Sequence, residues 1–396
     1  ELSPDTFGFY GELRDEVERF MKIPHVTLPS SYEAPHLFAC FFQVRRAFHH
    51  IFRYIIGTSM AAARLRATVW ESIFTHDIRR YRRMLYDRMG DITTLVTGPS
   101  GTGKELAARA IAFSRYVPFD EKARRFTERP RSAFLPLNLS ALSPTLIESE
   151  LFGHRRGAFT GALEDRVGWL EVCSPSGTVF LDEIGDTDVA IQAKLLRVIQ
   201  TRAFQRLGET DTRHFRGKLI AATNRNLGRE MRAGRFREDL YYRLCSDIVT
   251  TPSLHEQLRE SPGELRNLIV FIARQEAGEV AEELAEEVTT WIGQNLGAEY
   301  PWPGNFRELE QCVRNVLIRK EYVPPRPAER NTREGLANDF CDGTVTADEV
   351  LRRYCTIVYA QTGNYVETAR RLAADRRTVK SKIDPQLLEK LRRDLR

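Results

Sequence analysis

TTLVTGPSGTGKELAARA, residues 93–110, is the stretch that decides the fold of this chain. Its first five residues are β-branched or aliphatic, which predicts a buried strand, and apolar residues at helical spacing follow the glycines. The loop between them has the spacing G-x-x-x-x-G-K, in which successive backbone N–H groups point at phosphate oxygens. The stretch predicts an α/β fold around a phosphate-binding loop, whose residues are Gly98, Pro99, Ser100, Gly101, Thr102, Gly103, Lys104 and Glu105.

Two acidic residues are expected to complete this site. Lys104 would reach the β and γ phosphates, but Glu105 stands where a Ser or Thr hydroxyl usually ligates Mg²⁺, so another oxygen is needed. Residues 177–183, GTVFLDE, predict a buried strand that ends in Asp182 and Glu183. The carboxyl ends of parallel strands line the ligand crevice, so we expect Asp182 to hold Mg²⁺ and Glu183 to polarise the attacking water. Two such acids can also serve only as a helix cap.

Two segments outside this site have a marked composition. Residues 157–162, GAFTGA, place an apolar residue and a hydroxyl between glycines, which predicts a mobile loop that presents Phe159 outward. The alternative is a turn folded back on its own core. Residues 76–86, HDIRRYRRMLY, are basic and aromatic, which fits either a contact with nucleic acid or a solvated helix face.

Length and composition limit the number of domains and the class of protein that the chain can form. With 396 residues the chain can form two to four domains, and its net charge of +5 does not by itself imply nucleic acid. The six cysteines are scattered without metal-ligand spacing, which is typical of reduced cytoplasmic proteins. Neither a signal peptide nor an apolar run of membrane-spanning length is visible. The first residue is Glu1, which leaves an upstream domain open.

Seven motifs occur in one order: GPSGTGKE, ESELFGH, GAFTGA, TVFLDEIGD, AATNRNL, GRFREDLYYRL and WPGNFRELE. Over residues 53–319 the chain therefore resembles the AAA+ ATPase domain of bacterial enhancer-binding proteins, the activators of sigma-54 RNA polymerase. GAFTGA is the most specific of these motifs, because other AAA+ proteins lack it. The resemblance implies an AAA+ P-loop ATPase core with a parallel sheet and a helical lid, with ATP and Mg²⁺ as cofactors. It also implies a homo-oligomeric ring, a hexamer as in the family.

The same resemblance implies roles for residues near the strand ends. Asn138 looks like the partner that holds Glu183 until ATP binds. Thr223 and Asn224, at the end of the expected strand 218–224, look like sensor I, and this polar pair also suits the orientation of water. The family carries a glutamate after the loop lysine, so Glu105 fits.

The resemblance also implies roles for three arginines and for the GAFTGA loop, residues 157–162. Arg237 and Arg243 are similar to arginine fingers that reach the nucleotide of a neighbouring subunit, and Arg307 looks like sensor II. The expected sigma-54 contact is made by Gly157, Ala158, Phe159, Thr160, Gly161 and Ala162. Two departures from the family stand out: the chain inserts the basic run around residues 79–83, and residues 254–259 replace the usual arginine-rich start of the lid.

The last residues predict a separate helical domain. Thr346 to Glu349 form a capping box before a helix, and two short helices follow, joined by a turn in which Ala373 replaces a usual glycine. This end resembles the Fis-type helix-turn-helix of the same activators. The residues expected to contact double-stranded DNA are Arg376, Arg377, Thr378, Lys380 and Lys382.

We therefore expect five regions: an N-terminal extension of unknown role (1–52), the ATPase core (53–252), the lid (253–322), a linker (323–344) and the helix-turn-helix (345–396). The expected function is a cytoplasmic, sigma-54-dependent transcription activator. It would bind upstream enhancer DNA and hydrolyse ATP to remodel the RNA polymerase holoenzyme into the open complex. Two alternatives stay open: an AAA+ remodeller with another client, or a DNA-binding regulator whose ATPase is only structural.

Overall fold

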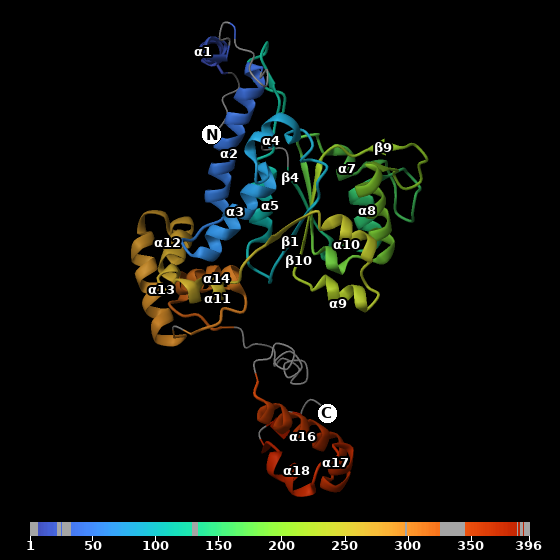
Figure 1. The fold of residues 1–396 in the computed structure, drawn as a ribbon, viewed down its shortest axis with the longest axis vertical. Helices are drawn as coiled ribbons and strands as arrows, with labels where there is room; N and C mark the ends of the chain where they lie inside the picture. The colour runs from blue at the N-terminus through green and yellow to red at the C-terminus, as the bar shows by residue number, and fades with distance from the viewer. Residues whose placement is uncertain are drawn as a thin grey trace. The chain divides into compact units, whose positions relative to one another are not determined.

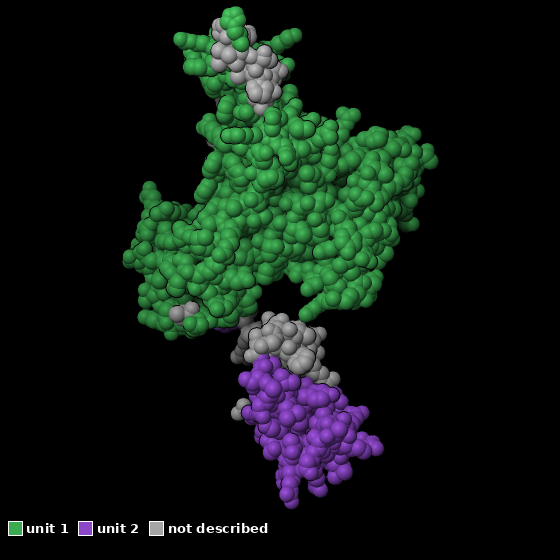
Figure 2. All heavy atoms as spheres, viewed as in Figure 1, with its two compact units in different colours: residues 1–322 green, residues 323–396 purple. Residues whose placement is uncertain are grey.

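The computed structural model describes residues 7–21, 25, 33–128, 134–297, 299–324, 345–385, 387, 388 and 391. The chain divides into two compact units, residues 1–322 and 323–396 (Figure 2). None of the helices within the described ranges has both the length and the apolar composition needed to cross a bilayer.

A five-stranded parallel sheet forms the centre of the first unit. Its strands are β1 (Thr94–Thr97), β4 (Phe134–Asn138), β7 (Thr178–Asp182), β10 (Lys218–Thr223) and β11 (Asp247–Thr250). They lie in the order β11-β1-β10-β7-β4, and every pairing is parallel. The run that opens the phosphate-binding stretch thus forms β1, a buried strand between β11 and β10, and the predicted buried strand is present.

Helices cover both faces of this sheet (Figure 1). On one face, α2 (Ala34–Tyr54), α3 (Met60–Phe74) and α5 (Lys104–Ala112) pack on a core that includes Val96 and Ile220. On the other, α6 (Pro144–Phe152), α8 (Val189–Thr201) and α10 (Glu238–Leu244) pack on a core that includes Leu95 and Leu219. Successive strand residues therefore pack into the cores on opposite faces of the sheet, which explains why these strands are apolar throughout. The expected α/β class is confirmed.

Four helices follow the last strand and form the expected lid region. They are α11 (Leu254–Glu260), α12 (Glu264–Ala277), α13 (Ala281–Asn295) and α14 (Asn305–Arg319). They share a core that includes Leu268, Val288, Trp302 and Leu309. The segment that departs from the family, residues 254–259, forms α11, which begins with a capping box between Ser253 and Glu256.

An aromatic cluster joins the N-terminal residues to the first unit. The helix α1 (Tyr10–Met21) follows Phe7, whose ring lies 5.3 Å from that of Phe38 on α2 and 5.9 Å from that of Phe119. Phe119 belongs to a short hairpin of β2 (Phe119–Asp120) and β3 (Arg125–Phe126). The helix α2 continues through residue 52 and packs on α5, so it forms part of the body of the first unit.

The described part of the second unit includes the helices α16 (Ala347–Thr362), α17 (Tyr365–Arg371) and α18 (Arg376–Lys382). Side chains of Thr346, Asn364 and Asp375 cap their N-termini. In the turn before α18, Ala373 has φ +49°, the left-handed conformation for which a glycine is usual. The predicted helical hairpin is therefore present.

Lys218 is a buried lysine within the sheet. Its ammonium group donates hydrogen bonds to the carbonyls of Ile92 (2.7 Å) and Met89 (3.3 Å). Burial lowers the pKa of Lys218 from 10.5 to about 7.

This shift predicts a pH dependence of stability. Between about pH 7 and the ordinary value of 10.5, the unfolded chain binds the Lys218 proton and the folded chain does not, so the free energy of unfolding rises with pH. Below pH 7 both states are protonated and this contribution is flat. Lys218→Met should remove the rise, which is measured as the difference between wild-type and variant denaturation curves at each pH. An identical pH dependence in both proteins would contradict the buried, neutral lysine.

Candidate functional site

The phosphate-binding loop is packed tightly between β1 and the lid. Gly98 has φ +145°, and a Cβ there would lie 2.2 Å from Thr251 Oγ1. Gly101 has φ +76°, and a Cβ there would lie 2.3 Å from the carbonyl oxygen of Gly304. Both positions therefore require glycine, because side chains are excluded by contact as well as by backbone conformation. Their backbone N–H groups remain available to an anion at the N-terminus of α5.

Lys104 closes the loop from within. Its Nζ donates to the carbonyls of Gly98 and Pro99, both at 3.1 Å. Burial lowers the pKa of Lys104, while the charges of Glu183 and Asp182 oppose the shift. An ammonium group held only by two carbonyls, beside two carboxyls, is placed to receive phosphate oxygens.

The two acids stand at the end of β7, with Asp182 as its last residue, as the sequence predicts. Burial raises the pKa of Asp182, although the Glu183 N–H, at 3.0 Å from Oδ1, and the charge of Lys104 oppose this. Glu183 has φ +56°, an unfavourable conformation for a non-glycine residue that is common at functional sites. Among the described residues no group of three or more His, Cys, Asp or Glu side chains could hold a metal. Asp182 nevertheless fits Mg²⁺, which commonly takes one or two carboxylates together with phosphate oxygens and water.

The candidate sensor residues lie at the same carboxyl-terminal edge of the sheet. Asn138 pairs in register with Asp182, and the backbone N–H of Asn224 donates to Glu183 Oε2 at 3.4 Å. The side-chain oxygen of Asn138 accepts from Ser140 N (2.9 Å) and Ser140 Oγ (2.8 Å). The structure thus brings these groups together, but Glu183 is held from the sensor strand while Asn138 is held by its own turn.

Thr223 and the residue after Asn224 stabilise this edge. Thr223 is fully buried, and its Oγ1 accepts from the backbone N–H of Arg225 at 3.0 Å. The Arg225 guanidinium forms an ion pair with Asp186, in the turn after Glu183. Arg225 was not among the expected site residues, although it lies inside the motif AATNRNL.

The two candidate finger arginines lie at either end of α10. Arg237 precedes the helix and forms a bidentate pair with Asp239 at 3.0 and 2.6 Å, while its N–H donates to Gln192. Arg243 is exposed near the helix end. A shallow cavity of about 530 Å³ is lined by Arg237, Glu238, Asp239 and Tyr242. Because water screens this exposed ion pair, Asp239 can release Arg237 at little cost.

The lid contacts the loop through the start of α14. Asn305 Nδ2 donates to the Ser100 carbonyl at 2.9 Å, and its Oδ1 accepts from Leu254 N at 2.8 Å. Phe306 N donates to the Gly101 carbonyl at 3.0 Å, and Arg307 Nη1 lies 3.5 Å from Ser100 Oγ. Arg307 is therefore at the loop, as expected of a sensor. Sequence reasoning missed Asn305, although it stands two residues before Arg307 in WPGNFRELE.

The GAFTGA loop is a closed hairpin tip in this structure. Gly157 N donates to the Ala162 carbonyl at 2.9 Å, and Ala162 N to the Phe159 carbonyl at 3.0 Å. The Phe159 ring packs edge-on against His154, with centroids 5.0 Å apart. Phe159 is therefore half-buried in this state, with its ring against the buried His154, and its presentation to a partner stays a prediction. Leu163 is the exposed apolar residue of the segment, at 80%.

Comparison with known proteins identifies the domain. Residues 73–249 match the family described as Sigma-54 interaction domain. These residues belong to the sigma-54 interaction domain family. The resemblance predicted from the seven motifs is confirmed.

Relatives of the sigma-54 interaction domain extend beyond this chain. Transcriptional regulatory protein ZraR of Klebsiella oxytoca is 40% identical over 299 residues, which are 74% of this chain and 63% of that protein. Hydrogenase transcriptional regulatory protein HoxA of Cupriavidus necator is 44% identical over 225 residues, 56% of this chain and 42% of that protein. The chain thus spans less than two thirds of either relative. A crystal structure of NtrX from Brucella abortus in complex with ATP is similar in fold, with a TM-score of 0.50 at 23% identity over 96% of this chain and 81% of that chain.

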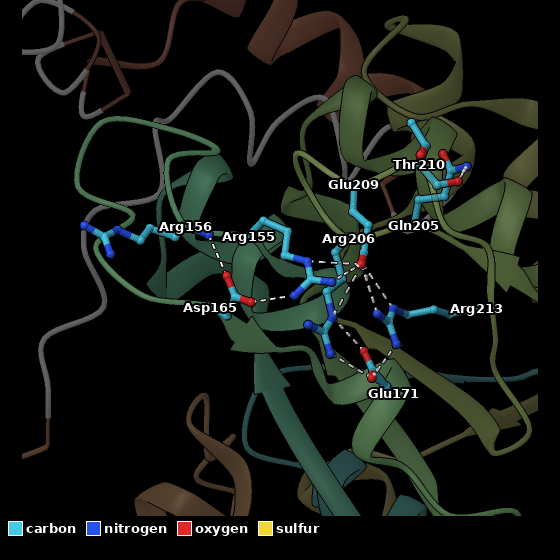
Figure 3. Close-up of polar contacts among 9 residues, drawn as sticks. All are labelled: Arg155, Arg156, Asp165, Glu171, Gln205, Arg206, Glu209, Thr210 and Arg213. Atoms are coloured by element: carbon cyan, nitrogen blue, oxygen red, sulfur yellow. Dashed lines mark hydrogen bonds and ion pairs between the residues drawn. The ribbon is translucent and has the colours of Figure 1, made fainter.

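An ion-pair network anchors the GAFTGA loop within the sigma-54 interaction domain (Figure 3). Arg155, at the base of the loop, bonds to Asp165 (2.5 Å) and to Glu209 (2.6 Å). Glu209 also binds Arg213 at 3.0 Å, and Glu171 binds Arg206 and Arg213, each at 2.8 Å. The network joins the loop to α7 (Trp169–Val172) and to the hairpin of β8 (Ala203–Phe204) and β9 (Arg213–His214).

The candidate DNA-binding residues lie on α18 of the second unit. Arg376, Arg377, Thr378 and Lys380 are exposed, while Val379 between them is buried. Lys382 is expected to contact DNA, yet here its ammonium pairs with Asp348 at the start of α16. It therefore ties two helices together in this structure.

The catalytic assignment predicts two separable defects. Lys104→Ala removes a charge-assisted phosphate contact and should weaken ATP binding roughly 10- to 100-fold. Glu183→Gln should retain binding and lose turnover by about 10²- to 10⁴-fold, because the amide cannot accept a proton from water. Glu71→Gln, an exposed site on α3, is the matched control. Nucleotide titration and steady-state ATPase assays measure both, and normal turnover in Glu183→Gln would contradict the assignment.

The lid contact predicts an effect on affinity alone. Asn305→Asp keeps the acceptor for Leu254 N and loses the donor to the Ser100 carbonyl. Leaving this carbonyl unpaired costs about 1 to 3 kcal/mol, so ATP should bind roughly 5- to 100-fold more weakly. Asn295→Asp, the same change at the end of α13, should leave the affinity unchanged. Equal ATP dissociation constants for wild type and Asn305→Asp would show that the bond from Asn305 to the Ser100 carbonyl does not affect ATP affinity.

Proposed function

We propose that this protein is a sigma-54-dependent transcription activator that hydrolyses ATP to remodel the RNA polymerase holoenzyme. The observation that carries the proposal is a complete GAFTGA loop in the same sigma-54 interaction domain as an undamaged set of nucleotide residues. ZraR and HoxA are named as transcriptional regulatory proteins, which is consistent with this reading. The proposed place of action is the cytoplasm, where the polymerase is.

Each nucleotide-site residue of the chain would have a separate role in hydrolysis. Lys104 and the loop N–H groups would bind the phosphates, and Arg307 would contact them from the lid. Asp182 would hold Mg²⁺, which neutralises charge that develops on the phosphoryl oxygens. Glu183 would orient and deprotonate the attacking water, held in place by the Asn224 N–H. Because Glu183 lies one residue after Asp182, both groups can face one phosphate chain.

Neighbouring copies of the chain would complete each site. Arg237 and Arg243 sit on the surface at α10, where they can reach a nucleotide bound to the next subunit of a ring, which we propose to be a hexamer. Arg237 would exchange its bond with Asp239 for phosphate. Arginine suits this task because its planar guanidinium binds phosphate in a bidentate manner.

Hydrolysis would act on sigma-54 through the GAFTGA loop. In the present state Phe159 is docked on His154, and the hairpin is closed. We infer that ATP releases this docking, so that Phe159 and Thr160 become available to sigma-54. A loop that binds its partner in only one nucleotide state supplies the differential affinity needed to drive a conformational change.

Binding to enhancer DNA is assigned to the second unit. Arg376, Arg377, Thr378 and Lys380 are exposed on one short helix after a turn, which suits insertion into the major groove. Lys382 would contribute by positioning α18 through Asp348 rather than by contacting DNA.

Loop substitutions test the proposal. Thr160→Ala and Phe159→Ala should leave ATPase activity and DNA binding within about twofold of wild type, because the loop is separate from both sites, while open-complex formation at a sigma-54 promoter falls at least tenfold. Thr201→Ala, at an exposed threonine of α8, is the control. Normal open-complex formation in both loop variants would overturn the proposed role, and an inactive wild-type protein at every sigma-54 promoter would favour another client.

A further inference from the structure

We propose that the inserted basic segment binds the phosphates of duplex DNA, as a second DNA contact beyond that proposed for α18. The segment comprises α4 (Ile78–Arg80), the π-helix η1 (Tyr81–Leu85) and the turn through Arg88. We call its exposed arginines the basic patch: Arg79, Arg80, Arg83 and Arg88.

The patch is held rigidly on the first unit. Tyr81 is buried, and its hydroxyl donates a 2.9 Å hydrogen bond to Oε1 of Gln43, which lies on α2. Gln43 Nε2 in turn donates to the Ser114 carbonyl at 2.9 Å, after α5. The Asp77 carboxylate caps α4 by accepting from the N–H groups of Arg79 and Arg80. A surface fixed in this way loses little conformational freedom on binding, which favours a ligand contact over a solvated tail.

The patch arginines differ from most arginines around them in their lack of carboxylate partners. In the part of the chain that the structure describes, no ion pair is found for Arg79, Arg80, Arg83 or Arg88, whereas Arg155, Arg206 and Arg213 each bind acidic side chains. Residues 76–88 contain five arginines and two aspartates. One of these, Asp77, is occupied by the backbone cap. The positive charge of the patch is therefore left for an external anion.

The geometry favours nucleic acid phosphate over a lipid surface. Membrane-surface helices insert a continuous apolar face, but here Tyr81 is buried in the core of the unit and Leu85 packs against it. Ile78 and Met84 are the exposed apolar side chains of the segment. Arginine matches the geometry of phosphate oxygens, and π-helical turns occur often at functional sites.

The position of the patch allows both ligands at once. The segment leads into the amino end of β1, whereas the phosphate-binding loop leaves its carboxyl end. Figure 1 shows α4 at the end of the sheet opposite the lid. DNA bound there would not cover the nucleotide site.

The salt dependence of DNA binding measures how many phosphates the basic patch contacts. The full-length chain is titrated against a labelled duplex of arbitrary sequence over a series of NaCl concentrations. Each phosphate contact contributes a slope of about −0.9 in log K against log salt, so replacing all four patch arginines by glutamine should reduce the slope by about 2 to 4 per protomer. Replacing them by lysine should restore most of it, because lysine keeps the charge.

A matched control separates the patch from overall charge. It carries four arginine-to-glutamine changes at other exposed arginines: Arg197, Arg229, Arg232 and Arg319. A slope for the patch variant equal to that of this control would overturn the proposal and leave an acidic protein as the partner. The ATPase activity of both variants checks that they are folded.

A second background separates this inference from the function of α18. In a chain with Arg376→Ala, Arg377→Ala and Lys380→Ala, residual salt-dependent binding should persist and should disappear when the patch is also replaced. If this triple variant has no residual binding, the patch does not bind DNA, whatever α18 does.

Discussion

The hydrogen bond from Phe306 N to the Gly101 carbonyl, 3.0 Å long, joins the lid to the phosphate-binding loop, and the rest of the site depends on it. Asn305 reinforces this contact by bonding to Ser100 and to the first residue of α11. The lid cannot move away without breaking bonds to the loop that receives the phosphates. These contacts give a direct path by which nucleotide binding and lid position can be coupled.

On the other side of the phosphate-binding loop, the catalytic candidate Glu183 lies at the carboxyl end of the sheet. Glu183 combines an unfavourable backbone conformation with a long bond to the sensor strand, at 3.4 Å, and its neighbour Asp186 is fixed by Arg225. Strain of about 1 to 3 kcal/mol at such a residue persists only when its surroundings impose it. A γ phosphate that competes for the Asn224 N–H would release Glu183, and we propose that this change reaches the loop that holds Phe159.

Local sequence patterns predicted the phosphate-binding strand, the acids after β7 and the capped C-terminal helices, because each depends on residues close together in the chain. The patterns could not predict contacts made by distant segments. The Phe159 ring packs against His154, and Lys382 pairs with Asp348 of another helix. Asn138 faces Ser140 although it stands next to Asp182 in the sheet, since side-chain direction is decided by the following turn.

Amide hydrogen exchange across residues 153–168 tests the central claim, that the nucleotide state controls the GAFTGA loop. The full-length protein is compared without nucleotide, with ADP and with a non-hydrolysable ATP analogue, with the phosphate-binding loop as an internal check of occupancy. We expect the ATP analogue alone to speed exchange at Gly157 and Ala162, as the hairpin bonds open and Phe159 leaves His154. Unchanged exchange in this segment, together with protection of the phosphate-binding loop, would contradict it.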